Sequence, residues 1–119
     1  MNEIFNGLES FPESIKGLKT PCYVIDEKKL IHNAKVLASV ISHTGCKILL
    51  AQKAFSNYDF YPLLSGYISG TEASGLFEAR LGKEEMPSGE VHVFWAAYRD
   101  DKFDELLKYA DHIVFNSIN

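Results

Sequence analysis

The fold is decided by residues 46–53, which read Cys46-Lys47-Ile48-Leu49-Leu50-Ala51-Gln52-Lys53. The middle of this segment is an almost unbroken run of apolar residues. Such a middle is typical of a strand in a parallel sheet, because that kind of sheet is covered on both faces. We therefore expect a buried parallel strand here, with helices supplied by the segments on either side.

A helix is expected just before this strand, over residues 27–43. Its apolar residues recur at spacings of four, three and four, so they share one face; they are Leu30, Ala34, Leu37 and Ile41. Asp26 is a typical N-cap, and Gly45 is a typical helix terminator. A further strand is expected at 22–25. Cys22 and Cys46 would then be buried in strands, as reduced thiols without a disulfide.

After the decisive strand, helix and strand patterns alternate. We expect helices over residues 57–66, 76–81 and 102–109, and strands over residues 70–73, 91–95 and 112–115. Gly82 is expected to cap the second of these helices. Alternation of this kind with short connections predicts an α/β fold whose strands are parallel and joined by right-handed crossovers.

Length bears on the choice between the two common parallel architectures. A (β/α)8 barrel takes about 250 residues, so the strands of this 119-residue chain make roughly half of one. The last strand, 113–115, has no helix after it, as in a truncated barrel. A doubly wound sheet could be completed by a chain of this size and stays an alternative.

Composition excludes several classes of function. The formal net charge is −4 and no basic cluster is present, so nucleic acid is not an expected partner. The longest apolar run, Ile48–Ala51, is far shorter than the ~20 residues of a membrane helix. Residues 1–6 do not read as a secretory signal, so a cytoplasmic location is expected.

Lys53 is the first candidate for chemistry, because reactive groups in parallel α/β folds gather where strands end. Strand side chains alternate, so Lys53 should share a face with Leu49 and Ala51, while Gln52 points toward the helices. An apolar surrounding would lower the pKa of the lysine and leave a free amine to condense with an aldehyde. A solvated lysine at a strand end is the alternative.

Four blocks carry a resemblance to a known family. They are Thr20-Pro21-Cys22-Tyr23-Val24-Ile25-Asp26, Lys47-Ile48-Leu49-Leu50-Ala51-Gln52-Lys53-Ala54-Phe55, Ala73-Ser74-Gly75-Leu76-Phe77-Glu78-Ala79-Arg80 and Ala110-Asp111-His112-Ile113-Val114-Phe115-Asn116-Ser117. In this order, the blocks resemble the opening third of the alanine-racemase-like, pyridoxal-phosphate-dependent decarboxylases, in particular the group acting on carboxynorspermidine or carboxyspermidine. Gln52 departs from the family, where an apolar residue is common, and so does Trp95-Ala96, where Ser-Pro is common.

The resemblance implies a fold, a cofactor and a substrate. Residues 1–45 would be a lead-in strand and helix, residues 46–119 the first four strands of a TIM barrel, and a separate β-domain would follow beyond residue 119. The cofactor would be pyridoxal 5'-phosphate and the substrate a small polyamine precursor, decarboxylated to norspermidine or spermidine. The full-length enzyme would be a homodimer, and this fragment would be inactive alone.

The resemblance also implies site residues. Lys53 would be the catalytic lysine that binds the cofactor. Ser74 would lie near the cofactor, although a small residue opening a helix can equally be an N-cap. Glu78 matches the family too, or it is a glutamate favoured by the helix dipole. Asn116 ends the fourth strand on the expected rim, or it is frayed.

No metal site is expected. The four histidines, His32, His43, His92 and His112, do not stand at the spacings of zinc ligands. Two other functions stay open: a non-enzymatic carrier of pyridoxal phosphate with the same barrel, and a flavodoxin-like module that binds a nucleotide or a partner. Strand order separates the flavodoxin-like module from a barrel fragment, whose neighbours follow the chain.

Overall fold

The computed structural model describes residue 15 and residues 17–118. Its sheet contains β1 (Leu49–Ala51), β2 (Gly70–Ala73), β3 (Glu90–Phe94) and β4 (His112–Val114), in the spatial order β1-β2-β3-β4. Every neighbouring pair is parallel. The order therefore follows the chain, as expected for consecutive barrel strands, and it lacks the reversal of a doubly wound sheet within the described residues.

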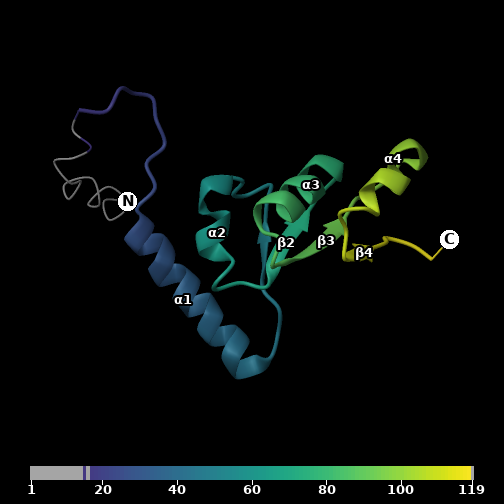
Figure 1. Cartoon of the computed structure of the whole chain (residues 1–119), viewed down its shortest axis with the longest axis horizontal. Helices are drawn as coiled ribbons and strands as arrows, with labels where there is room; N and C mark the ends of the chain where they lie inside the picture. The colour runs from purple at the N-terminus through teal and green to yellow at the C-terminus, as the bar shows by residue number, and fades with distance from the viewer. Residues whose placement is uncertain (1–14, 16, 119) are drawn as a thin grey trace, which may run out of the picture.

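Helical segments alternate with the strands (Figure 1). They are α1 (Glu27–Thr44), the 3-10 turn η3 (Tyr58–Phe60), α2 (Tyr61–Leu64), α3 (Leu76–Glu85) and α4 (Asp100–Leu106). The two capping residues of α1 are the predicted ones, and the helix is one residue longer than the predicted 27–43. Asp26 accepts a hydrogen bond from the Lys29 backbone N–H at 3.1 Å, and Gly45 ends the helix at φ 71°. A left-handed conformation at this position favours glycine, which has no Cβ.

The core lies between the sheet and the helices, in two clusters. The cluster over β2 and β3 contains Ala73, Leu76, Ala79, Val91, Val93 and Leu106. The cluster near α1 and α2 contains Ala34, Tyr61, Leu64, Ile68 and Met86. Alternation along the strands therefore points Val91 and Val93 toward the helices.

The opposite side of the sheet is termed the open face below. By strand alternation and register it carries Leu49, Ala51, Glu72, Glu90, His92, Phe94, His112 and Val114. None of these residues belongs to the two core clusters of the described structure. The open face is thus partly polar and is not covered by the described helices.

Several sequence-predicted boundaries differ from the structure. The strand expected over 46–53 is regular only over Leu49–Ala51, and the helix expected over 57–66 is divided into η3 and α2. Gly82 is not a helix cap, because α3 continues to Glu85 and Gly82 is buried within it. Its missing side chain lets α3 approach β2: a Cβ at Gly82 would stand 2.2 Å from Thr71 Oγ1.

The lead-in strand expected at 22–25 is not formed within the described residues. Tyr23 there is fully exposed, with a relative accessibility of 103%. Cys22 and Cys46 are free, as predicted, but both are exposed, so their assignment to buried strands was wrong. A lone extended segment cannot form a strand without a partner for its backbone groups. Residues 1–6 lie outside the described residues.

Candidate active site

Lys53 lies two residues after the end of β1, in the turn that follows the strand. The Ala54 and Phe55 backbone N–H groups both donate to the Ala51 carbonyl oxygen, at 2.9 and 3.2 Å. The Lys53 side chain is exposed and makes no hydrogen bond or ion pair with another described residue. The dry pocket expected around this amine is therefore not built by the described residues, because the open face has no second layer over it.

Gln52 fixes the direction in which the chain leaves β1. Its backbone N–H extends the ladder to β2, donating to the Glu72 carbonyl oxygen at 3.1 Å. Its side chain is 1% exposed and points to the helix side, where Nε2 donates to the Glu78 carbonyl oxygen at 2.8 Å. The Tyr61 hydroxyl donates to Gln52 Oε1 at 3.2 Å. The prediction that Gln52 points toward the helices is confirmed.

Burial protects the Tyr61 hydroxyl from ionisation. Desolvation, followed by the charge of Glu78, raises the pKa of Tyr61 to about 12. The hydroxyl is therefore protonated at neutral pH and can donate to Gln52. The sequence predicted that Gln52 points toward the helices, but its two hydrogen bonds as a buried polar anchor are visible only from the packing.

Ser74 directly follows β2, and the structure decides between the two interpretations of this residue. The N-cap of α3 is Gly75, with no side-chain cap. The Ser74 hydroxyl is buried and has no hydrogen-bond partner among the described residues. Glu78 instead closes the helix start, because its Oε2 accepts from the Ser74 backbone N–H at 2.6 Å. Ser74 is thus not an N-cap, and its hydroxyl has hydrogen-bonding capacity to spare.

A hollow of about 340 Å³ adjoins Ser74. Its lining is mostly apolar but includes two cationic side chains; the residues are Ser74, Gly75, Leu76, Phe77, Glu78, Trp95, Arg99 and Lys102. Arg99 is paired with Asp101, with its NH2 nitrogen 2.8 Å from Oδ2. Lys53 does not line the hollow. The structure therefore places Lys53 and Ser74 after the carboxyl ends of neighbouring strands, but the hollow beside Ser74 does not include Lys53.

The loops after β3 and β4 are tied together. Asn116 Nδ2 donates a hydrogen bond to the Ala96 carbonyl oxygen. The Tyr98 hydroxyl lies within hydrogen-bond distance of two strand carbonyl oxygens, those of Val114 at 2.7 Å and Val93 at 3.2 Å. Asn116 is accordingly held by a contact, and the fraying considered for it is not what the structure shows.

The residues at this edge are chemically compatible with pyridoxal phosphate. Lys53 offers an amine and Ser74 an unused hydroxyl, on neighbouring strands whose ends face the same way. An aldehyde requires the amine, and a phosphate or ring oxygen can accept from the hydroxyl. The buried orphan hydroxyl is the observation that favours a ligand here, since such groups are normally paired.

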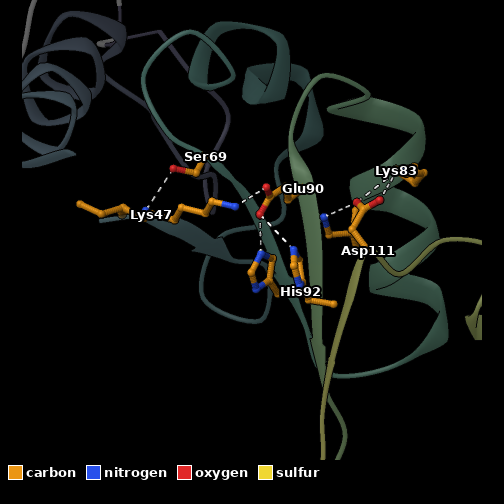
Figure 2. A network of polar contacts seen from close by, with 9 residues as sticks. Lys47, Ser69, Lys83, Glu90, His92 and Asp111 are labelled. Carbon is orange, nitrogen blue, oxygen red and sulfur yellow. Dashed lines mark hydrogen bonds and ion pairs between the residues drawn. The ribbon is translucent and has the colours of Figure 1, made fainter. Parts of the chain in front are cut away.

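A second polar cluster was missed by sequence analysis. Figure 2 shows Glu90 lying between Lys47 and His92. His112 approaches the same carboxylate. His92 and His112 stand 20 positions apart in the chain, and only the register of β3 and β4 brings them together. The signal that could have found this cluster was a histidine on each of two neighbouring expected strands, at positions whose side chains point to the same face of the sheet.

Comparison with known proteins places these features in a family context. A carboxynorspermidine/carboxyspermidine decarboxylase from Herminiimonas arsenicoxydans is 37% identical over 102 residues, which is 86% of this chain and 28% of the relative. A protein of the same name from Campylobacter jejuni is 39% identical over 101 residues, 85% of this chain and 26% of the relative. This chain is homologous to these decarboxylases. The sequence-based recognition is thereby confirmed.

A third relative and a solved structure agree with the decarboxylase relationship. The carboxyaminopropylagmatine decarboxylase of Synechocystis sp. is 35% identical over 87% of this chain and 27% of the relative. The crystal structure of the Campylobacter jejuni carboxynorspermidine decarboxylase, complexed with norspermidine, superimposes with a TM-score of 0.80 at 39% identity. That match covers 84% of this chain and 27% of the solved chain. No family model matches the sequence.

The decarboxylase relatives are much longer than this chain. The chain spans between 26% and 28% of their length. Within that span the mixed α/β fold with parallel strands is shared with a solved decarboxylase. None of the described helices has both the length and the apolar character of a membrane span.

Proposed function

We propose that this chain is the cofactor-anchoring part of a pyridoxal-phosphate-dependent decarboxylase that acts on carboxynorspermidine or carboxyspermidine in polyamine biosynthesis. The observation that carries the proposal is Lys53 at the carboxyl end of β1, in a chain whose named relatives are decarboxylases. A non-enzymatic carrier of the same cofactor could use the same lysine. The names of the relatives favour the enzyme.

The proposal includes the first half of a (β/α)8 barrel, with a β-domain in the remainder of the enzyme. Three features support the barrel: the parallel strands follow the chain order, helices alternate with them, and none of the described helices covers the open face. A closed barrel would turn the open face inward and surround the strand ends with loops. Closure would also exclude water from Lys53, which the described residues leave exposed.

Each residue at the strand ends has a proposed role. Lys53 supplies the nucleophilic nitrogen, which must lose its proton before it can react with an aldehyde. Ser74 donates its hydroxyl hydrogen to an acceptor on the ligand, since no described residue takes it up. Gln52 positions Lys53 by anchoring the strand end on the helix side. Bound pyridoxal phosphate would supply an aldehyde and a conjugated ring that can accept the electron pair left on the substrate carbon when carbon dioxide departs.

The test is covalent capture of the cofactor. Pyridoxal phosphate is added to the chain, absorbance at about 420 nm is followed, and borohydride reduction with peptide mapping then identifies the modified lysine. We expect modification at Lys53 and loss of the absorbance in Lys53→Ala. Lys35→Ala is the matched control, because Lys35 is an exposed lysine of α1 and belongs to neither the strands nor the loops after them.

Two outcomes would contradict the proposal. The first is equal absorbance in wild type and Lys53→Ala. The second is modification spread evenly over the exposed lysines. A Ser74→Ala variant adds a graded measurement: we expect weaker cofactor retention with Lys53 still modified, because the serine holds the ligand and does not react with it.

A further inference from the structure

Glu90, His92 and His112 form a compact group on the open face, which we term the open-face triad. Glu90 begins β3, and His92 follows two residues later on the same side of the strand. His112 begins β4 and is the direct register partner of His92. The three side chains therefore come from two hydrogen-bonded strands, and the backbone of these strands limits how far the side chains can move relative to one another.

The side chains of the triad converge on one point. Glu90 Oε2 lies 2.8 Å from His92 Nε2 and 3.4 Å from His112 Nε2. The two imidazole rings are 4.2 Å apart between centroids and tilted by 33°. One nitrogen of each histidine and one carboxylate oxygen lie within 4.8 Å of one another.

These distances approach those of a tetrahedral metal site. Zinc binds histidine nitrogen at about 2.0–2.1 Å and carboxylate oxygen at about 2.0–2.2 Å, so neighbouring ligand atoms of a tetrahedron are about 3.3 Å apart. The observed separations of 2.8 and 3.4 Å bracket this value. Small side-chain rotations would thus suffice to admit an ion.

We propose that the open-face triad binds a divalent transition-metal ion of the zinc type through Glu90 Oε2, His92 Nε2 and His112 Nε2. Two imidazoles with one carboxylate are a donor set that zinc takes in proteins. This assignment revises the expectation of no metal site, which depended on spacing along the chain and not on strand register.

The surroundings of Glu90 prepare it as a ligand. Lys47 pairs with Oε1, which leaves Oε2 directed at the two histidines. A partner that orients a ligating carboxylate is a usual feature of metal sites.

The triad does not depend on the proposed cofactor. Glu90 and His112 are the first residues of their strands, whereas Lys53 and Ser74 follow the last residues of theirs. The register sets Glu90 level with Leu49, and His92 and His112 level with Ala51, so the triad precedes the level of Lys53 and shares no residue with the proposed cofactor site. A metal at the triad would tie β3 to β4, so its effect should be measurable as binding and as thermal stability, without decarboxylase activity.

The experiment is a titration of the chain with Co²⁺, whose absorption bands report coordination, followed by displacement with Zn²⁺. We expect one bound ion per chain and a thermal midpoint that rises with Zn²⁺ concentration, as for any ligand of the folded state. His92→Gln and His112→Gln should each weaken Co²⁺ binding by at least about tenfold. His43→Gln is the matched control, since His43 is an exposed histidine at the end of α1.

A second measurement needs no variant. Imidazole ¹⁵N resonances of the wild-type chain should shift on addition of Zn²⁺ for His92 and His112, and not for His32 or His43. Equal Co²⁺ affinity in wild type and His112→Gln would overturn the proposal. So would a loss of affinity in His43→Gln as large as in the triad variants, or equal shifts at all four histidines.

Discussion

At the scale of single residues, Gln52 is the side chain that connects the core to the candidate site. It is almost fully buried, and both ends of its amide are used, one by the Glu78 carbonyl oxygen and one by the Tyr61 hydroxyl. A buried amide is tolerated because its hydrogen bonds offset the loss of contact with water. Gln52 therefore orients its neighbour Lys53 as well as stabilising the packing of β1.

Replacing Gln52 by Leu tests how much the Gln52 hydrogen bonds stabilise the packing of β1. Leucine keeps the burial but leaves the buried Tyr61 hydroxyl without its partner, which costs about 1–3 kcal/mol, and it removes the additional hydrogen bond from Gln52 to the Glu78 carbonyl oxygen of α3. We expect the free energy of unfolding, measured by urea denaturation, to fall by a few kcal/mol. Tyr61→Phe is the control and should lose less, because it orphans only one side of the amide. An unchanged free energy in Gln52→Leu would show that the anchor contributes nothing.

The residue scale also shows what sequence can and cannot supply about a site. The opposed directions of Gln52 and Lys53 follow from strand alternation, and the burial of Gln52 confirms the side predicted for it. The Ser74 hydroxyl is free of a capping role because Gly75 is the N-cap of α3, and the sequence pattern alone was compatible with either role for Ser74. The His92 and His112 pair requires the register between two strands, which local sequence does not encode.

At the scale of elements, the close packing of α3 on β2 determines how the second strand end is presented. Gly82 lies in the middle of α3, and its Cα faces Thr71 of β2. A Cβ there would stand 2.2 Å from Thr71 Oγ1 and 3.2 Å from Thr71 Cβ. The Thr71 hydroxyl is itself buried without a partner among the described residues. The contact therefore has no space for a methyl group.

Gly82→Ala should destabilise the protein, against the usual helix preference for alanine of about 1 kcal/mol. We expect a loss of roughly 1–3 kcal/mol in the free energy of unfolding, because overpacking forces α3 away from β2. Adding Thr71→Ala should recover part of this loss, since it removes the clashing oxygen. The measurement is a double-mutant cycle by urea denaturation. Additive effects of the two substitutions would contradict the proposed contact.

The elements themselves were largely predictable. The order of helices and strands after residue 26 follows from apolar periodicity and from turn residues, and Asp26 and Gly45 mark the ends of α1 as expected. The misjudged boundaries have a common cause. Gly82 looked like a terminator because its local pattern does not reveal the neighbouring Thr71. The segment at 22–25 has strand composition, yet a strand also needs a partner.

At the scale of the whole molecule, the two faces of the sheet differ in what they contact. The helix side is a closed apolar core, whereas the open face combines the polar triad with exposed apolar side chains. Phe94 and Val114, which are register partners, are 43% and 50% exposed. In addition, β1 and β4 have only one strand neighbour each among the described residues. Uncovered apolar surface and open sheet edges both favour association with another chain.

The chain on its own should therefore self-associate through its open face. Sedimentation velocity over a range of concentrations is expected to show species larger than a monomer. Phe94→Lys should reduce this association, because it places a charge among the exposed apolar side chains of the open face. Phe77→Lys is the matched control: Phe77 is 83% exposed on α3, on the helix side, so its substitution should leave association unchanged. A compact monomer at every concentration would contradict both the open face as a contact surface and the proposal that a closed barrel normally covers it.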